Sequence, residues 1–316
     1  MREGDFSQLL EDLAEQRLLT EIVAANAFLA DHDVLQLGTS LSASADKICH
    51  KLLMAVKTDC APKSQLEVLP LGKWGGRELG VKSDLDFIFY CPNKPEPDDF
   101  RLAKRFVSRL TEQHKGGAIY SVDLRLRPSG NAGPLLVQWS ALEEYLAQRS
   151  SPWERQSYLR ARPLNPLANS QLTKCFASRG LNSTELTELR EIRTKLLKTN
   201  DTATRINIRL VAGGLIDTEL SIQTLILYHK ILSPHTNTTE MIDDLTQFIP
   251  EAQQYQLKKN YIALRRLEQM FQIKSSRSGS EFSLNSTPFQ STAEELAQSP
   301  EELFNSTAET LHQNAM

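Results

Sequence analysis

The chain has 316 residues, enough for two domains of ordinary size. Its 36 basic and 39 acidic residues give a net charge of −3. This balance argues against sequence-independent nucleic-acid binding, which needs a basic surface that displaces counterions. No apolar run reaches the roughly 18 residues of a membrane span, and the acidic N-terminus is unlike a secretory or transit peptide. We therefore expect a cytoplasmic protein without a membrane or nucleic-acid partner.

The cysteines and histidines give no sign of a metal or disulfide scaffold. The four cysteines are widely spaced and form no CxxC pair, so neither a disulfide framework nor a zinc site is expected. His229 and His235 are the closest pair of histidines, and their spacing does not place them on one helix face. Solvated loop or helix positions are the simpler interpretation.

The N-terminal part predicts a helical leader. Apolar residues recur near helical spacing over residues 5–57. The stretch 38–44, which begins with Gly38, is expected to divide this leader into two helices. Residues 1–62 are assigned to the leader.

A small mixed core follows in residues 63–168. VLPLG is a short apolar strand, a glycine-rich turn comes next, and DLDFIFY is a second strand that ends at a proline-rich loop. A helix is predicted over residues 98–114. AIYSVDLRLRP then predicts a third strand, stopped by Pro128. The expected fold class is therefore α+β.

The rest of the chain, residues 169–316, predicts an all-α bundle. SPEE at 299–302 is a capping box that indicates a helix start, as does SALE at 140–143 in the preceding core region, and a helical region opens at Ser183. The polar, serine-rich stretch 275–289 indicates a linker or exposed loop. One helix is expected to face the core, because its apolar residues recur in steps of three and four. These residues are Leu257, Tyr261, Leu264, Leu267 and Phe271.

Three aspartates on two predicted strands carry the chemistry. Because side chains alternate along a strand, Asp84 and Asp86 share one face of DLDFIFY. In SVDLRLR, Val122, Leu124 and Leu126 form the apolar face, so that Asp123, Arg125 and Arg127 point the other way. If the two strands are neighbours, three carboxylates converge on one side of the sheet with two arginines close by.

Such a cluster needs compensation, since like charges a few ångströms apart raise each other's pKa. Oxygen-only ligation suits Mg²⁺, and two metal ions about 3.5–4 Å apart stabilise an in-line displacement at phosphorus. The pair Gly75-Gly76 ahead of the second strand fits a backbone that approaches phosphate closely. GKWGGRELG is neither a Walker loop nor a dinucleotide-binding GxGxxG motif.

Each of these motifs also has a plain structural interpretation. Paired aspartates in a strand can be a solvated face, and a glycine pair can be a simple turn. Asp123 with Arg125 and Arg127 can form surface ion pairs that contribute little to stability. Their joint occurrence, in this order and between apolar strands, favours function.

GKWGGRELGVKSDLDFIF and VDLRLRPSGNAGPL resemble the bacterial glutamine synthetase adenylyltransferase/adenylyl-removing family. PWERQSYLRARPL, RLVAGGLIDTELSIQTLIL and YIALRRLEQM continue the resemblance in the same order, so that it covers roughly residues 10–275. The resemblance implies a polymerase-β-like nucleotidyltransferase core followed by a helical bundle. It also implies metal-binding and nucleotide-binding residues. The metal ligands would be Asp84, Asp86 and Asp123, and the residues at the nucleotide phosphates would be Gly75, Gly76 and Ser83, with Arg125 and Arg127 offsetting phosphate charge.

Members of this family normally carry two such units. One attaches AMP from ATP to a tyrosine of glutamine synthetase, and the other removes it by phosphorolysis, which yields ADP. The resemblance therefore implies Mg²⁺, with ATP or ADP and phosphate as substrates, and glutamine synthetase and a PII-type signalling protein as partners. This chain contains one unit, and its motifs are mixed: GPLL and WERQ are closer to the removing unit, GGLIDTE to the transferring one. Leu220 and Thr218 depart from the family pattern.

Several interpretations stay open. Asp217 and Glu219 at a predicted helix start are explained by capping as well as by contact with the active site. Interdomain packing explains Trp153 and Glu154 as well as a functional role does. Arg160 and Arg162 are expected to contact either phosphate or the helical domain. At the level of function, a non-catalytic regulatory module and a nucleotidyltransferase with another acceptor remain alternatives.

Overall fold

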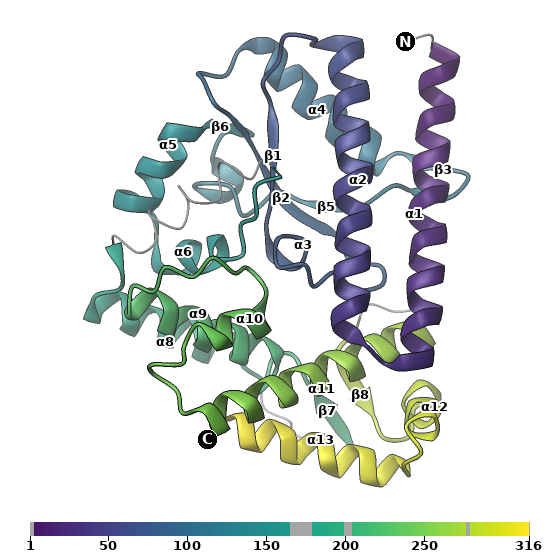
Figure 1. Ribbon diagram of the computed structural model, residues 1–316, viewed down its shortest axis with the longest axis vertical. Coiled ribbons are helices and arrows are strands. Elements are labelled where there is room, and N and C mark those ends of the chain that lie inside the picture. Colours follow the sequence, from purple (N-terminus) through teal and green to yellow (C-terminus); the bar gives the residue numbers. More distant parts are fainter. Residues whose placement is uncertain (1–2, 165–178, 199–203, 276–278, 316) are drawn as a thin grey trace. The chain divides into compact units, whose positions relative to one another are not determined.

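The computed structural model describes residues 3–164, 179–198, 204–275 and 279–315 (Figure 1). It is rich in helices and contains small sheets, which confirms the α+β class at that level. Among these residues no helix is both long and apolar enough to cross a membrane. The predicted domain boundary at residue 168 and Cys175 lie outside the described residues. The chain forms two compact units. Unit 1 comprises Met1–Ala27, Gln36–Arg179 and Pro234–Asn237, and unit 2 comprises Phe28–Leu35, Gly180–Ser233 and Thr238–Met316.

Unit 1 contains two long helices, a small central sheet and several short helices. In chain order the elements are α1 (Glu3–Asp31, whose last turn belongs to unit 2), α2 (Val34–Cys60), β1 (Glu67–Pro70), α3 (Gly72–Gly75), β2 (Leu85–Cys91), α4 (Pro97–Thr111), β3 (Gln113–His114), β4 (Gly117–Ala118), β5 (Val122–Asp123), the 3-10 turn η1 (Gly130–Ala132), β6 (Leu136–Gln138), α5 (Trp139–Glu144), the π-helical turn η2 (Tyr145–Arg149) and α6 (Pro152–Tyr158).

The two long helices are divided earlier than the sequence predicts. The break lies at His32 and Asp33, where His32 adopts a left-handed backbone with φ of 58° and Asp33 Oδ1 accepts the amide of Leu35 at 3.0 Å. Gly38 lies inside α2, so the expected break over 38–44 is wrong. A Cβ on Gly38 would lie 2.9 Å from the carbonyl oxygen of Arg77. The glycine is therefore required for close packing of the chain against α2.

Strand β2 is the centre of the sheet. β1 pairs with it antiparallel, from Glu67 opposite Tyr90 to Pro70 opposite Phe87. β5 and β6 pair with it in parallel, so both must use the edge of β2 that β1 leaves free. The first two predicted strands are thus confirmed, and they place the acidic start of β2 beside β5.

The third predicted strand is only partly correct. β5 ends at Asp123, and the chain then turns away from the sheet and returns as β6 at Leu136. Leu124 and Leu126 are half-buried in the turn instead of forming a buried apolar face. The guanidinium of Arg127 explains this excursion, because it donates to the carbonyls of Leu124 at 2.7 Å, Asn131 at 3.2 Å and Gly133 at 3.3 Å.

The core of unit 1 packs on the face of β2 opposite Asp86. Phe87 and Phe89 point into this face, and Phe106 of α4 meets them edge-on at 6.1 and 5.8 Å between ring centroids. Trp74 of α3 meets Phe87 at 5.9 Å. All four rings are almost fully buried. Their burial, worth roughly 1.5–3 kcal/mol for each large apolar side chain, fixes the orientation of β2 and hence of its acidic face.

Unit 2 is mainly helical and contains one small sheet. Its elements are α8 (Ser183–Leu196), β7 (Arg205–Asn207), α9 (Leu215–Tyr228), α10 (Thr238–Asp243), α11 (Glu251–Ser275), β8 (Glu281–Ser283), α12 (Thr287–Glu295) and α13 (Pro300–Ala315). α11 is the predicted core-facing helix, since Tyr261, Leu264 and Leu267 are buried. The predicted helix start at 299–302 is confirmed: the amide of Ser299 donates to Glu302 at 2.8 Å, and Ser299 Oγ accepts the amide of Glu302.

Three expectations, two for the helical part of the chain and one for a helix of unit 1, are wrong. The stretch 275–289 is no linker in its described part, because β8 pairs antiparallel with β7 there and Phe282 is fully buried. Unit 2 is for the same reason not all-α. The predicted cap at 140–143 fails as well, since α5 begins at Trp139 with Gln138 before it and without a side-chain cap.

Candidate active site

The backbone brings two of the three predicted carboxylates together. Asp86 lies directly opposite Asp123 in the parallel pairing of β2 with β5. The amide of Leu85 extends this pairing by donating to the Ser121 carbonyl at 2.9 Å. Asp84, one position before the strand, is exposed at the same end of the sheet. The predicted neighbourhood of the two strands is thus confirmed.

Asp86 occupies an unfavourable place for a charged group. Its carboxylate lies over Gly72, where a Cβ would approach Oδ2 to 2.2 Å. Gly72 has a left-handed φ of 51°, so glycine is required there both for conformation and for space. Burial, followed by the charges of Asp84 and Asp123, raises the pKa of Asp86 from 3.8 to about 6. Asp86 therefore shows the electrostatic coupling expected of clustered carboxylates.

Asp123 is held by its neighbour Arg125. The guanidinium Nε of Arg125 donates to both carboxylate oxygens of Asp123, at 3.0 and 2.8 Å, and the amide of Arg125 donates to Oδ1 at 2.8 Å. These hydrogen bonds lower the pKa of Asp123 below 3.8. Asp123 and Asp86 thus have pKa values shifted in opposite directions.

The side chains are not arranged as a finished metal site. Within the described ranges, no three aspartate, glutamate, histidine or cysteine side chains are close enough together to hold a metal ion as they stand. The ion pair between Asp123 and Arg125 explains this, because both carboxylate oxygens of Asp123 face the guanidinium. The donor chemistry, three carboxylates with two of them in register on adjacent strands, nevertheless suits Mg²⁺.

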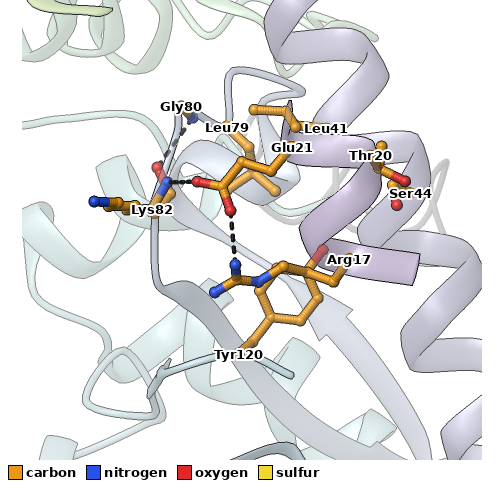
Figure 2. A pocket seen from close by; sticks show the side chains of 10 residues that line it. Arg17, Thr20, Glu21, Leu41, Ser44, Leu79, Gly80, Lys82 and Tyr120 are labelled. Carbon is orange, nitrogen blue, oxygen red and sulfur yellow. Dashed lines mark hydrogen bonds and ion pairs between the residues drawn. The ribbon is translucent and has the colours of Figure 1, made fainter. Parts of the chain in front are cut away.

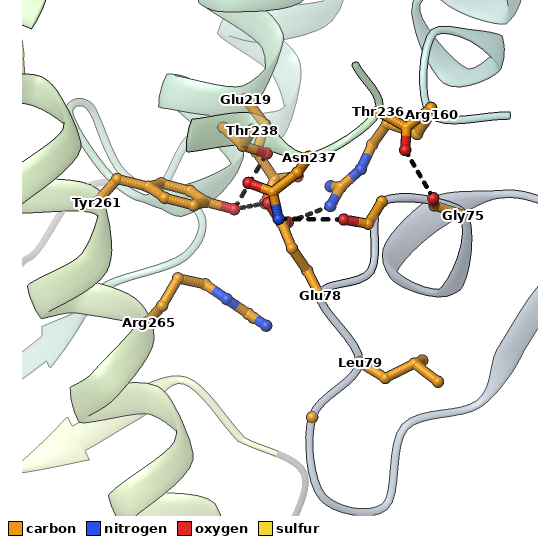
Figure 3. A network of polar contacts seen from close by, with 12 residues as sticks. Gly75, Glu78, Leu79, Arg160, Glu219, Thr236, Asn237, Thr238, Tyr261 and Arg265 are labelled. Carbon is orange, nitrogen blue, oxygen red and sulfur yellow. Dashed lines mark hydrogen bonds and ion pairs between the residues drawn. The ribbon is translucent and has the colours of Figure 1, made fainter. Parts of the chain in front are cut away.

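The glycine pair has a packing role. Gly75 and Gly76 are buried at the end of α3, and a Cβ on Gly75 would lie 2.0 Å from the Arg160 carbonyl oxygen. Their carbonyls accept hydrogen bonds from Thr236 Oγ1 at 2.9 Å and Asn237 Nδ2 at 3.2 Å (Figure 3). The Arg160 backbone carbonyl explains Gly75, and the Arg160 guanidinium, 2.5 Å from a Cβ on Gly76, explains Gly76. A contact with phosphate stays a prediction for them.

Arg160 and Arg162 are structural within unit 1. Arg160 forms a buried ion pair with Glu78, seen in Figure 3. Arg162 donates to both carboxylate oxygens of Asp46 on α2, at 3.0 and 2.8 Å, and Asp46 also accepts the indole N–H of Trp74 at 2.8 Å. These contacts fasten the segment after α6 to α2 and α3. They favour the structural interpretation of both arginines over contact with phosphate.

Ser83 closes the turn that leads into Asp84. Its Oγ accepts the amide of Gly80 at 3.0 Å, and its own amide donates to the Gly80 carbonyl at 3.2 Å. The Ser83 hydroxyl proton is not used by the bond from Gly80, so it can be donated to an incoming oxygen. The predicted role of Ser83 at a nucleotide phosphate thus has the right chemistry and awaits a test.

The remaining acidic candidates are held by local contacts. Asp217 is buried, pairs with Arg193 and accepts the amide of Gly213 at 2.8 Å. Glu154 forms a capping box at the start of α6 and accepts the Tyr145 hydroxyl at 2.7 Å. Both arrangements are accounted for by structure alone.

Glu219 and Trp153 complete the set of downstream candidates. Glu219 accepts the hydroxyl of Tyr261 at 2.9 Å, a contact inside unit 2 that Figure 3 also shows. Trp153 is 39% exposed on α6. Sequence reasoning did not single out Gly72, whose only signal was its place in a glycine-rich turn. It also did not single out Arg17 and Glu21 of α1, which contact the segments before Asp123 and Asp84 but carried no signal in the sequence.

Comparison with known proteins assigns the chain to a family. The sequence profile of the family described as Glutamate-ammonia ligase adenylyltransferase matches residues 8–177, more than half of the chain. The chain belongs to this family. The resemblance carried by the motifs around Asp84 and Asp123 is thereby confirmed.

Three individual relatives share one name. The chain is 33% identical to the bifunctional glutamine synthetase adenylyltransferase/adenylyl-removing enzyme of Alteromonas mediterranea, in an alignment that covers 65% of this chain and 23% of that protein. Against the protein of that name from Neisseria meningitidis it is 35% identical, with 62% of this chain and 23% of the relative covered. Against the Bordetella pertussis protein of that name it is 28% identical, with 87% of this chain and 33% of the relative covered.

The matches differ in how much of each protein they cover. The chain spans about a quarter to a third of the length of these relatives. A second profile, described as GlnD PII-uridylyltransferase, matches residues 184–306, a stretch that includes most of unit 2.

Proposed function

We propose that this chain is a nucleotidyltransferase unit that moves AMP between ATP or ADP and a tyrosine of glutamine synthetase. The observation that carries the proposal is the register of β2 and β5, which sets Asp86 opposite Asp123 with Asp84 at the same end. The unit would have a polymerase-β-like core, and it would act in the cytoplasm to regulate nitrogen assimilation. The family name and the relatives' names support this assignment.

Mg²⁺ fits the donor set of this site. Asp84 and Asp86 would hold two ions, and Asp123 would complete one of them after releasing Arg125. When bound, the metal ions align an oxygen nucleophile with the α-phosphorus and neutralise charge as the bond breaks. The pKa of Asp86, raised to about 6 by burial and then by the charges of Asp84 and Asp123, supports this proposal because a cation offsets both effects.

The side chains of this chain would divide the remaining work. Asp123, whose pKa is lowered by its hydrogen bonds with Arg125 as long as the two are paired, would orient the attacking oxygen. Arg125, which is exposed and adjacent, would turn from Asp123 to the phosphate charge. Arg127 was also predicted at the nucleotide, but its guanidinium is occupied by three carbonyls of its own loop. We therefore propose that Arg127 fixes the loop that carries Arg125.

Nucleotide and protein partners follow from the same assignment. Ser83 would donate its hydroxyl to a phosphate oxygen, and the buried Gly75-Gly76 pair would set the turn ahead of it. Glutamine synthetase would be the acceptor. A PII-type signalling protein is the second proposed partner, which the match of residues 184–306 to a PII-uridylyltransferase profile supports.

One incubation tests the proposal and its direction. The purified chain is mixed with glutamine synthetase or its AMP-modified form, labelled ATP and phosphate, and the movement of label is followed. Transfer to the protein indicates adenylylation, and release as ADP indicates phosphorolysis. Asp86→Ala should abolish either reaction while the circular dichroism spectrum stays the same. Near-normal turnover by this variant would refute the assignment of the metal site.

A non-catalytic regulatory module is the second candidate. It is favoured by the engagement of Asp123 with Arg125, which leaves no finished metal site among the described residues. Calorimetry with ATP, with and without Mg²⁺, separates the two candidates. Mg²⁺-dependent binding supports the enzyme, and no binding at millimolar ATP supports the module. Transfer of AMP to another acceptor would show as labelled product without glutamine synthetase.

A further inference from the structure

Helix α1 reaches the turn that precedes Asp84. Glu21 Oε1 accepts the backbone amide of Lys82 at 2.5 Å (Figure 2). Lys82 is two residues before Asp84 and has a left-handed φ of 57°. This conformation costs a residue with a side chain roughly 1 kcal/mol, so it persists where neighbouring groups fix it. Glu21 is such a group.

The same helix reaches the segment that precedes Asp123. Arg17 Nε donates to the carbonyl of Ile119 at 3.1 Å, four residues before Asp123. The guanidinium also lies 5.9 Å from the centroid of the Tyr120 ring. One turn of α1 therefore contacts both approaches to the candidate site.

Arg17 and Glu21 are joined to each other. Arg17 Nη1 donates to Glu21 Oε2 at 2.8 Å, and the side chains are 23% and 12% exposed (Figure 2). The pair thus forms a continuous connection from the Ile119 carbonyl to the Lys82 amide. An i, i+4 pair alone would contribute only a few tenths of a kcal/mol to a helix. Its significance lies in what its two ends hold.

The cavity beside this pair is too small for a substrate. It has a volume of about 20 Å³ and is lined by α1, α2 and the turn at Gly80–Ser83, as Figure 2 shows. That is room for about one water molecule. The pair therefore acts on a substrate only through the backbone segments that it holds.

We propose that Arg17 and Glu21 are positioning residues, which set the spacing between the Asp84–Asp86 end of β2 and Asp123 by connecting the two preceding segments. This inference rests on the proposed function, since it assigns the spacing to metal binding and AMP transfer. It also gives the helical leader a part in the active site. The hydrogen bonds of the pair go to the Ile119 carbonyl, to the Lys82 amide and between its own two side chains, and not to the three carboxylates.

Loss of the pair should leave the fold intact. α1 packs on unit 1 through buried apolar residues, whereas Arg17 and Glu21 are at the rim of that contact. The buried apolar residues of α1 in unit 1 are Phe6, Leu10, Leu13 and Ala14. Glu11 of the same helix offers a matched control, because it pairs at 3.6 Å with Lys115 in the β3–β4 turn and contacts neither approach to the site.

The test compares Glu21→Ala, Arg17→Ala and Glu21→Gln with Glu11→Gln in the full chain. Three quantities are measured: hydrogen exchange of the Lys82 amide and of residues 119–123, the affinity for Mn²⁺ by electron paramagnetic resonance, and kcat and KM for AMP transfer. We expect about tenfold faster exchange at Lys82 in Glu21→Ala, as for loss of a charged hydrogen-bond acceptor. Mn²⁺ binding should weaken about three- to tenfold, and kcat should fall with little change in KM for ATP.

Glu21→Gln keeps an acceptor for the Lys82 amide but loses the charge that Arg17 pairs with. It should restore slow exchange at Lys82 and recover part of the Mn²⁺ affinity, whereas Glu11→Gln should behave like the wild type. Unchanged exchange at both segments in Glu21→Ala and Arg17→Ala would overturn the inference, and so would faster exchange with unchanged Mn²⁺ affinity and kcat. A wild-type chain that binds no Mn²⁺ and transfers no AMP would overturn the proposed function and the positioning role together. The exchange rates would still show whether α1 holds the two segments.

Discussion

Replacing Asp86 by asparagine should stabilise unit 1 while removing its metal affinity. Asp86 is largely buried over Gly72 and lies near the charges of Asp84 and Asp123, so its ionised form is unfavourable in the folded chain. Asparagine has nearly the same shape and carries no charge. The substitution therefore removes this unfavourable charge without opening a cavity.

The size of the effect follows from the pKa. Asp86 titrates at about 6 when folded and near 3.8 when unfolded, a difference of about two units, or roughly 3 kcal/mol. Because the folded pKa is raised, the folded chain binds more protons between these values, and stability falls as pH rises from about 4 to about 6. The destabilisation of the folded chain by ionised Asp86 is therefore complete above about pH 6 and absent below about pH 4. Since the asparagine amide must also be desolvated, we expect a gain of about 1–3 kcal/mol at pH 7.5.

Tryptophan fluorescence during urea unfolding measures this gain. All three tryptophans lie in unit 1, so the signal reports that unit alone, with EDTA present to remove metal. The difference between Asp86→Asn and wild type should vanish near pH 4. Glu15→Gln, on an exposed position of α1, controls for loss of one negative charge. In a separate series without EDTA, Mg²⁺ at ten times its Kd should stabilise wild type by about 1.4 kcal/mol and leave Asp86→Asn unchanged. A variant no more stable than wild type at pH 7.5, or a difference independent of pH, would refute the reasoning.

Two further substitutions test the packing behind the site by the same urea assay. Gly75→Ala should lower the free energy of unfolding by more than about 4 kcal/mol, because the new Cβ would lie 2.0 Å from the Arg160 carbonyl oxygen. Gly4→Ala, with open space around it, should not lower it. Equal urea midpoints for the two variants would be inconsistent with this packing. Asp46→Ala should cost about 2–4 kcal/mol because it leaves the buried guanidinium of Arg162 unpaired, and Asp46→Asn should recover part of the loss. An Asp46→Ala chain within about 0.5 kcal/mol of wild type would contradict the second expectation.

The parts of the fold that sequence reasoning recovered depend on local pattern. β2 follows from the apolar residues on both sides of Asp86 in DLDFIFY, and the alternation of side chains places Asp86 away from the aromatic core at Phe87 and Phe89. Convergence of the carboxylates was expected on the condition that β2 and the strand carrying Asp123 are neighbours, and the register of β2 with β5 meets that condition. α11 was expected from the spacing of its apolar residues.

The errors occurred where a distant segment decides the local structure. Gly38 resembles a helix breaker in the sequence but is packed against Arg77, and β8 is a strand because β7 lies opposite it. The third strand ends after Asp123 because Arg127 closes on carbonyls further along the loop. The connection made by Arg17 and Glu21 was invisible for the same reason, since nothing in α1 reveals what its polar face meets.

Because the Asp86 carboxylate lies over Gly72, the effects of substitutions at these two positions, fourteen residues apart, should be coupled. Any side chain at 72 would displace the carboxylate at 86, although residue 72 itself has no reactive group. In a saturation-mutagenesis library, position 72 should therefore tolerate as little change as position 86. A double substitution should do little further harm once either has been lost, because the two positions are energetically coupled.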